Sequence, residues 1–461
     1  MDLLLTHAYF LYEDKTEKEI MKPYPVLGIL YISAYLKSKG FDVRVFDTTF
    51  KMKQDFYQYI DHQRPTIVGI YINLMTKLNA LKQIRYCKQH GCTVIVGGPD
   101  VPEYAEEYVQ FGADVAVIGE GERTMEELLP ALVKRTPLRL ITGIVFRNED
   151  GNIVRTGSRP LIQDLDSIPN PDRDAIDISA YIKTWRIYHG MGSVSLICAR
   201  GCPFTCTWCS RSVFGETHRR RSVKSVVDEI ELLREKYNPD MLWFADDVFT
   251  IHHKWFNEFY DEMKRRKISI PFECISRADR LNEDILKKMA ELGSFRIWYG
   301  SESGSQRILD AMQRHVSVDE IRRITKLAQK YGIQAGIFVM LGYPGESIAD
   351  IEQTVEHLKL TQANSFLTTV AYPIKGTQFY GDIENQILNN TNWQHITDRN
   401  LSFKGRFSKC FYWFANRYLT NEVLHTKSLS NGSKLSLTRS IAFLKAKTAR
   451  LGMTLTRGLL G

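Results

Sequence analysis

Three cysteines stand close together near the middle of the 461-residue chain, and their spacing suggests a metal centre. Cys202, Cys206 and Cys209 form a C-x3-C-x2-C pattern shortly after an apolar run that ends at Cys198. A structural zinc site normally takes four protein ligands, and an ordinary [4Fe–4S] cluster takes four cysteines. Three thiolates would bind three irons of such a cluster. The fourth iron would stay open to chelate a small molecule and pass it an electron.

Cys198 offers an alternative, because it could complete a set of four thiols in a zinc-bound interaction protein. It lies within the apolar run Val194–Cys198, where a cysteine usually packs as a small hydrophobe. We therefore prefer the three-cysteine set. The other cysteines are scattered and are expected to be structural: Cys87, Cys92, Cys274 and Cys410.

Composition and charge exclude several classes of protein. An apolar fraction of 44% and a charged fraction of 25% exclude a disordered chain, a collagen-like fibre and a small disulfide scaffold. The net charge is +8, but residues 423–461 hold seven of the 61 Lys and Arg residues and no Asp or Glu. The remaining 54 basic and 53 acidic residues leave the body nearly neutral. Nucleic-acid binding is therefore not expected, and the basic run His218–Arg221 is interpreted as solvated or cofactor-proximal.

The basic tail has the periodicity of an amphipathic helix. Apolar residues recur at near-helical spacing with basic residues among them: Leu437, Ile441, Leu444, Leu451 and Leu455, with Arg439, Lys445, Lys447, Arg450 and Arg457. Such a helix can lie on an anionic membrane, or it can pack on protein with a solvated basic face. The sequence shows neither a signal-peptide pattern nor an apolar run of about 18 residues. We expect a cytoplasmic protein, with peripheral membrane contact through the tail as an open alternative.

Two α/β segments must position these residues, and the first is residues 1–150. Short β-rich runs alternate there with amphipathic stretches, which predicts a Rossmann-like (flavodoxin-like) parallel sheet with helices on both faces. The expected strands are Leu3–Ala8, Asp42–Asp47, Ile67–Ile72, Thr93–Gly97 and Val115–Ile118, and the expected helices are Val26–Lys39, Leu74–His90, Pro102–Gln110 and Thr124–Lys134. Ligands bind beyond the carboxyl ends of the strands in such sheets. A hairpin over Ile144–Thr156 and a linker over residues 151–190 follow.

A second alternation predicts a partial barrel over residues 191–385. The expected strands are Ser193–Cys198, Met241–Ala245, Phe272–Ile275, Phe295–Tyr299, Gln334–Met340 and Phe366–Ala371. Six strand–helix units are fewer than the eight of a closed TIM barrel, so an open (β/α)6 barrel is expected. The cysteine loop follows its first strand, where barrel enzymes carry their chemistry. Residues 386–461 lose the alternation and predict a mainly helical C-terminal region.

The cysteine loop and five later segments together resemble the radical S-adenosylmethionine (SAM) superfamily. The run Ala199–Ser210, with an aromatic residue before its last cysteine, resembles the cluster motif of that family. Segments similar to the ends of the second to sixth barrel strands follow in order: Phe244–Thr250, Ile275–Arg280, Tyr299–Gly304, Gly336–Glu346 and Tyr372–Thr377. The resemblance covers residues 193–380.

The resemblance implies a [4Fe–4S] cluster on Cys202, Cys206 and Cys209, whose open iron binds SAM. One electron from an external donor such as flavodoxin or ferredoxin would cleave SAM to methionine and a 5′-deoxyadenosyl radical, which abstracts hydrogen from an unactivated carbon. Glu302 is expected to meet the SAM ammonium, and Arg277 either the SAM carboxylate or a protein carboxylate. The residues expected to border SAM are Phe204, Trp208, Asp246, Arg277, Ser301, Glu302, Gly336 and Tyr372. For Asp246 and its neighbour Asp247, an acid–base pair or a divalent-metal site is the alternative.

The N-terminal segment resembles the cobalamin-binding domain of one branch of this superfamily. That branch includes methyltransferases, the anaerobic magnesium-protoporphyrin monomethyl-ester cyclase and hopanoid-modifying enzymes. The resemblance rests on Pro25–Tyr31, Val96–Pro99 and Ile118–Glu122. The residues expected to border cobalamin are Leu27, Gly28, Tyr71, Asn73, Gly97, Gly98, Pro99, Gly119, Glu120 and Gly121. Many cobalamin domains ligate cobalt through the His of a D-x-H-x-x-G stretch, and residues 1–150 lack that stretch.

The sequence therefore predicts a radical SAM enzyme that uses cobalamin to methylate or oxidatively cyclise an unactivated carbon. The branch suggests a lipid-like or porphyrin-like small-molecule substrate. One alternative is a radical SAM enzyme without functional cobalamin, such as a methylthiotransferase or a hydrogen-abstracting isomerase. Methylthiotransferases usually carry a second set of three cysteines in the N-terminal domain, where this chain offers only Cys87 and Cys92. The zinc-bound interaction protein is the other alternative.

Overall fold

The computed structural model describes residues 1–388, 392–430 and 437–458. The chain forms two compact units. The first contains Met1–Pro203, Arg211–Ala245 and Asn392–Thr397, and the second contains Phe204–Ser210, Asp246–Thr391 and Asp398–Gly461. The cysteine loop therefore contributes residues to both units.

A seven-stranded sheet forms the centre of the first unit, in the order β2-β1-β3-β4-β5-β6-β7. Its strands are β1 (Leu3–His7), β2 (Val43–Phe46), β3 (Ile67–Tyr71), β4 (Thr93–Gly97), β5 (Val115–Val117), β6 (Ile144–Arg147) and β7 (Ile153–Arg155). The first five strands pair in parallel, and the predicted hairpin adds β6 and β7 antiparallel at one edge. Because β2 and β3 flank β1, the strand order reverses there, at the carboxyl edge where such sheets bind ligands.

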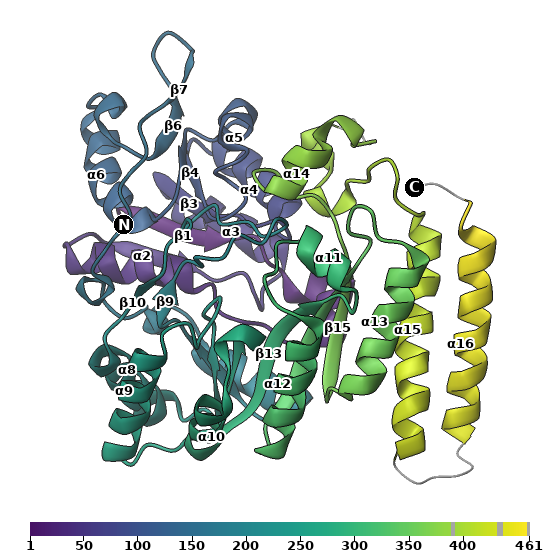
Figure 1. The fold of residues 1–461 in the computed structure, drawn as a ribbon. Helices are drawn as coiled ribbons and strands as arrows, with labels where there is room; N and C mark the ends of the chain where they lie inside the picture. The colour runs from purple at the N-terminus through teal and green to yellow at the C-terminus, as the bar shows by residue number, and fades with distance from the viewer. Residues whose placement is uncertain (389–391, 431–436, 459–461) are drawn as a thin grey trace. The chain divides into compact units, whose positions relative to one another are not determined.

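Helices cover both faces of this sheet (Figure 1). α2 (Leu27–Ser38) and α6 (Gly121–Lys134) share one apolar core with the sheet, whereas α3 (Lys53–Gln63), α4 (Lys77–Gln89) and α5 (Ala105–Phe111) share the other. The side chains of β1 alternate between the two cores, since Leu3 and Leu5 belong to the first and Leu4 to the second. The continuous apolar run of this strand is thus explained by burial on both faces.

Six further parallel strands follow the order of the sequence, β8-β11-β12-β13-β14-β15. They are β8 (Ser193–Leu196), β11 (Met241–Phe244), β12 (Phe272–Ser276), β13 (Ser294–Glu302), β14 (Gln334–Leu341) and β15 (Ser365–Val370). β8 and β11 pair within the first unit, and β12 to β15 pair within the second. The predicted fold, a parallel α/β sheet followed by a partial six-stranded barrel, is confirmed.

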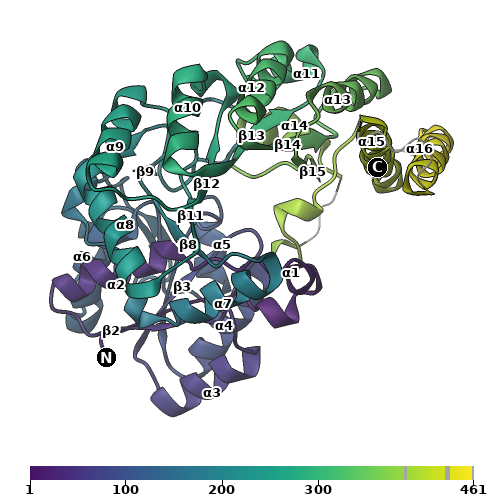
Figure 2. The same cartoon turned by 90° about the horizontal axis from the view of Figure 1, so that it is seen from below.

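A helix follows each of these strands. They are α8 (Val223–Tyr237), α9 (His253–Arg265), α10 (Glu283–Leu292), α11 (Gln306–Ala311), α12 (Val318–Lys330), α13 (Ile348–Thr361) and α14 (Gln378–Ile383). Two long helices, α15 (Lys409–Ser430) and α16 (Leu437–Thr456), then lie side by side, with α13 against α15 (Figure 1, Figure 2). Their approach is close, because a Cβ added at Gly452 of α16 would lie 2.4 Å from the Phe414 ring of α15.

Four helices escaped the sequence prediction: α1 (Lys15–Ile20), α3, α7 (Ile178–His189) and α14. α3 buries only Phe56 and Ile60, so its apolar stripe is too thin to recognise. α7 lies in the segment expected as a linker, because the prolines before it favour a loop over a helix. In the tail, Lys434 and the side chains of Leu437 and Arg439 lie outside the described residues. Within the described chain, no helix is long and apolar enough to span a bilayer.

Candidate active site

The three cysteines lie on one long hairpin loop. β9 (Ala199–Arg200) pairs antiparallel with β10 (Arg219–Arg220), and residues 201–218 between them form no helix or strand. Cys206 is buried, Cys202 is partly buried and Cys209 is exposed. The loop therefore has no regular hydrogen bonding of its own and must be held by contacts from outside.

Within the second unit, Thr207 anchors the middle of the loop. Its amide donates to the carbonyl of Met312 at 3.2 Å, and its carbonyl accepts from the amide of Phe379 at 2.9 Å. Its hydroxyl and that of Tyr343 are hydrogen-bonded at 2.6 Å. The neighbouring Trp208 packs against an apolar cluster of Ile308, Met312, Met340, Tyr343, Ala371, Phe379, Ile383 and Phe403. Backbone and side chain together thus fix the residues on either side of Thr207.

Two buried guanidinium groups face the sulfur of Cys206. The Nη1 atoms of Arg277 and Arg314 each donate to Cys206 Sγ at 3.6 Å. Arg277 also stacks on Phe204, with 3.7 Å from the guanidinium carbon to the ring centre. A sulfur ligand of an iron–sulfur cluster carries negative charge, which two adjacent cations stabilise. The donor set and its charge environment therefore fit a [4Fe–4S] cluster.

Glu302 ends β13 beside this pair of arginines. Its carboxylate Oε1 lies 3.7 Å from Arg314 Nε. Burial raises the pKa of Glu302, and the positive charges of Arg314 and Arg277 oppose that rise. A Cβ added at Gly300 would lie 2.1 Å from Glu302 Oε1, so only glycine leaves room for this carboxylate. A buried carboxylate fits the ammonium group of SAM.

The serines around Glu302 bond to helix α13 and set the direction of the strand end. Three pairs form: Ser301 with His357 at 2.9 Å, Ser303 with Thr354 at 3.1 Å and Ser305 with Asp350 at 2.6 Å. Burial lowers the pKa of His357 to about 4, which keeps its ring neutral near pH 7. Glu302 adopts the left-handed conformation at φ +56°, which is uncommon for residues other than glycine. The three serines face α13, while Glu302 faces Arg314.

The structure thus gathers several of the residues expected from the sequence. Phe204, Cys206, Arg277 and Glu302 lie in one group, with Trp208 5.8 Å from the guanidinium of Arg314. Arg277 is already engaged, because its Nε donates to Asp279 at 2.8 Å and its Nη2 to the carbonyl of Arg314 at 2.7 Å.

Arg314 was not predicted. It lies between Gln313 and His315, which both have left-handed backbones (φ +51° each), and no periodicity in the sequence marks it. The only available signal was a lone arginine in the turn between two helices.

For four residues expected to border SAM, the structure shows protein contacts or burial. The Ser301 hydroxyl is bonded to His357. Gly336 lies under the ring of Trp298, where an added Cβ would be 2.5 Å from that ring. Asp246 is buried directly after β11, and Tyr372 is half-buried after β15. The assignments of these residues to SAM stay predictions.

The residues expected to border cobalamin follow β3, β4 and β5 or begin α2, and their surroundings differ. A Cβ added at Gly28 would meet, among the described atoms, only Tyr71 at 3.9 Å, and one at Gly119 only the Val213 carbonyl at 3.7 Å. By contrast, a Cβ at Gly98 (φ +108°) would lie 2.5 Å from the Ile72 carbonyl, so packing alone demands glycine there. At Gly28 and Gly119, by comparison, a Cβ would make only ordinary van der Waals contacts.

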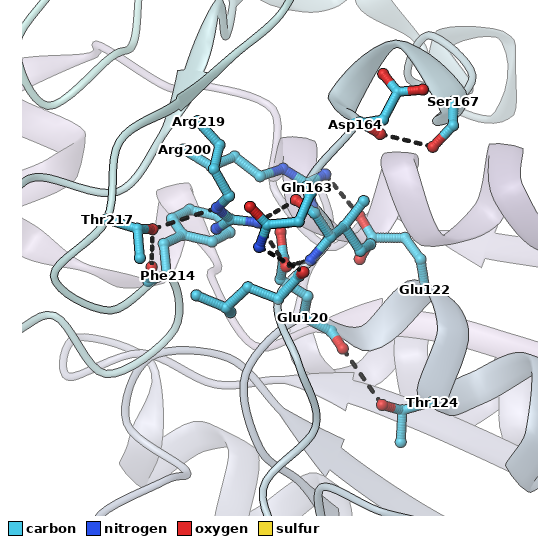
Figure 3. A network of polar contacts seen from close by, with 12 residues as sticks. Glu120, Glu122, Thr124, Gln163, Asp164, Ser167, Arg200, Phe214, Thr217 and Arg219 are labelled. Atoms are coloured by element: carbon cyan, nitrogen blue, oxygen red, sulfur yellow. Dashed lines mark hydrogen bonds and ion pairs between the residues drawn. The ribbon is translucent and has the colours of Figure 1, made fainter.

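Other members of the set have protein partners. Asn73 Oδ1 accepts from the amides of Met75 and Thr76 at 3.0 Å each, and the carbonyl of Pro99 accepts from Ser212 Oγ at 2.8 Å. Leu27 belongs to the apolar core. The remaining residues are Gly97, which ends β4, Gly121, which begins α6, and Glu120, whose carboxylate bonds to arginines (Figure 3).

Among the described residues there is no preformed group of three or more His, Cys, Asp or Glu side chains arranged to hold a metal ion.

Comparisons with known proteins show the family to which the chain belongs. The chain matches the radical SAM superfamily model over residues 196–358 and the B12 binding domain model over residues 19–129. It is 31% identical to an uncharacterized methyltransferase of Pyrococcus horikoshii, over 81% of this chain and 82% of that protein. It is 29% identical to the anaerobic magnesium-protoporphyrin IX monomethyl ester cyclase of Rubrivivax gelatinosus, over 73% of this chain and 62% of the cyclase.

A solved structure shows the same fold. The cobalamin-dependent SAM radical enzyme OxsB, with aqua-cobalamin and SAM bound, superposes with a TM-score of 0.75 at 15% identity. The match covers 98% of this chain and 72% of OxsB.

The chain belongs to the radical SAM superfamily. Within it, the chain belongs with the enzymes that carry an N-terminal B12-binding domain, whose members include methyltransferases and cyclases. Its cofactors are accordingly a [4Fe–4S] cluster, SAM and cobalamin, as the sequence predicted. This membership does not fit a zinc-bound interaction protein.

The close contact at Gly336 leads to a prediction about stability. Gly336→Ala should destabilise the cofactor-free protein by about 1–3 kcal/mol, because the new methyl group overlaps the Trp298 ring and both must shift. Urea unfolding followed by fluorescence measures this. Gly381→Ala in α14 is the matched control, since its Cβ would meet no described atom within 4 Å. If Gly336→Ala unfolds at the wild-type midpoint, this glycine is needed for something other than packing.

Proposed function

We propose that Cys202, Cys206 and Cys209 ligate the [4Fe–4S] cluster and that Glu302 receives the SAM ammonium beside it. The observation that carries the proposal is the pair of buried guanidinium groups 3.6 Å from Cys206 Sγ, next to a buried carboxylate. When bound, the cluster supplies the electron that cleaves SAM, and cobalamin supplies methyl-transfer or redox chemistry.

The chain's own residues stabilise charges and orient side chains at this site. Arg277 and Arg314 stabilise negative charge on Cys206, and Phe204 keeps the Arg277 guanidinium in its plane by stacking. A buried carboxylate is costly without a close cation, so Glu302 gains most when an ammonium group arrives. The bonds from its flanking serines to α13 stop Glu302 from turning away.

The proposed reaction is methylation or oxidative cyclisation of an unactivated carbon in an apolar substrate of lipid or porphyrin type. The relatives support it, one as a methyltransferase and one as a porphyrin ester cyclase. In the C-terminal region, aromatic side chains pack mainly on one another. Phe407 stacks on Phe411 at 4.1 Å between ring centres, and the Arg406 guanidinium lies over both Phe403 and Tyr412. The electron donor is proposed to be flavodoxin or ferredoxin.

Glu302→Gln tests the SAM assignment. With the cluster reconstituted anaerobically, the variant should keep wild-type iron and sulfide content but bind SAM about 10–100-fold more weakly, because one charge-assisted hydrogen bond is lost. Isothermal titration measures the affinity, and dithionite-dependent 5′-deoxyadenosine formation measures cleavage. Glu283→Gln, at an exposed ion pair with Lys330, is the control. An unchanged SAM affinity in Glu302→Gln would remove Glu302 from the site.

We also propose that α16 rests on an anionic membrane. One face of this helix is buried through Ala442, Ala446, Ala449 and Met453. The opposite face is apolar yet exposed: Ile441 by 41%, Leu444 by 63%, Leu451 by 59% and Leu455 by 74%. Exposed Lys445 and Lys447 flank that face. Apolar residues bordered by lysines favour the interface of an anionic bilayer.

Replacing two leucines tests the contact. Leu444→Ser with Leu451→Ser should weaken binding to vesicles of phosphatidylglycerol and phosphatidylcholine about 10-fold or more, because each buried leucine contributes about 1.5–3 kcal/mol when fully inserted. Co-sedimentation measures the bound fraction. Leu140→Ser is the control, since Leu140 is 85% exposed on another element. The proposal is contradicted if wild type, the double variant and Leu140→Ser sediment equally with these vesicles. It is also contradicted if wild type binds equally well to vesicles made of phosphatidylcholine alone.

A further inference from the structure

Two arginines face each other at the neck of the cysteine loop. In the short ladder that closes the loop, Arg200 on β9 stands directly opposite Arg219 on β10, and both are buried. Like charges opposite each other in a ladder repel, and burial strengthens the repulsion. The neck can close only if anionic groups are supplied to it.

Glu120 supplies the first of these groups by bridging both arginines (Figure 3). Its Oε1 accepts from Arg200 Nη1 at 2.7 Å, and its Oε2 accepts from Arg219 Nη1 at 2.8 Å. Glu122 supplies the second, because its Oε1 accepts from Arg200 Nη2 at 2.6 Å. One carboxylate thus ties the two sides of the neck together, and the other completes the charge balance.

The residue pair next to the neck is also closely packed. Gly201 has φ +88°, and a Cβ there would lie 2.3 Å from the Thr217 carbonyl. Cys202 follows directly. A neck that opens at Arg200 and Arg219 would therefore displace the first cysteine of the motif.

Both carboxylates come from the junction between β5 and α6 in the B12-binding segment, Glu122 from the first turn of α6. Glu120 precedes the first residue of α6, and it also accepts from the amide of Ile162 at 2.7 Å. The carboxylates that close the cysteine loop thus lie at a strand–helix junction that is expected to border cobalamin.

We propose that Glu120 and Glu122 are positioning residues of the iron–sulfur cluster, which hold the neck of the cysteine loop closed by neutralising Arg200 and Arg219. The inference rests on the proposed function, in which this loop carries the cluster. It gives the segment Gly119–Glu122, at the start of α6, a role in retaining the cluster in addition to bordering cobalamin.

The experiment compares iron release from anaerobically reconstituted, cobalamin-loaded protein. In Glu120→Gln the neck loses its bridging charge, so iron should pass to a chelator at least 10-fold faster than in wild type, and the EPR signal of the reduced cluster should broaden. Glu122→Gln should show a smaller effect, because it touches only Arg200. Glu127→Gln is the control on the same helix, since Glu127 pairs at the surface with Arg159 and should release iron at the wild-type rate.

A compensating variant separates charge balance from loss of a structural contact. Removing one arginine relieves the repulsion, so Glu120→Gln combined with Arg219→Gln should restore slow iron release. Circular dichroism and the urea-unfolding midpoint report whether each variant is folded. Iron release from Glu120→Gln at the wild-type rate, or equally fast release from the double variant, overturns the inference.

Failure of the proposed function gives a different result. In that case wild-type protein itself would hold no more cluster than Cys206→Ala. If wild type holds a cluster and cleaves SAM while Glu120→Gln keeps its iron, only the present inference fails.

Discussion

Two buried guanidinium groups facing one cysteine sulfur are the interaction on which the site depends. Arg277 and Arg314 both donate to Cys206 Sγ at 3.6 Å, and a buried cation without an anionic partner is strongly destabilising. The surrounding structure follows from satisfying these two charges. Asp279 pairs with Arg277, Glu302 lies beside Arg314, and Gly300 leaves the space that Glu302 occupies. The same charges suit an anionic iron–sulfur centre, so the constraint that stabilises the fold here also prepares the site for its cofactor.

Buried charges are also balanced at the base of the cysteine loop, where β9 pairs with β10. A loop of irregular backbone cannot hold its shape through its own hydrogen bonds. At its neck, Arg200 and Arg219 would repel each other without the carboxylates of Glu120 and Glu122. At its middle, Thr207 exchanges backbone hydrogen bonds with Met312 and Phe379. The loop is thus held by charge at one point and by backbone bonding at another.

Much of this could be predicted from the sequence, because strand and helix periods are strong where elements are buried on one or both faces. The cysteine spacing identified the loop, and Arg277 and Glu302 were recognised by their positions after two strands. Arg314 and His357 were not, since a partner supplied by a distant turn or helix leaves no mark at its own position. Glu120 illustrates the same limit: its place after β5 was evident, but a sequence does not show that its carboxylate faces Arg200 and Arg219.

The central claim is that a cluster on Cys202, Cys206 and Cys209 binds SAM through an open iron. EPR spectroscopy of the dithionite-reduced, reconstituted protein, recorded before and after addition of SAM, tests it most directly. The account predicts a reduced [4Fe–4S] signal whose g-values shift when SAM is added, because SAM becomes a ligand of that iron. A fully loaded cluster whose spectrum stays the same at saturating SAM would contradict it.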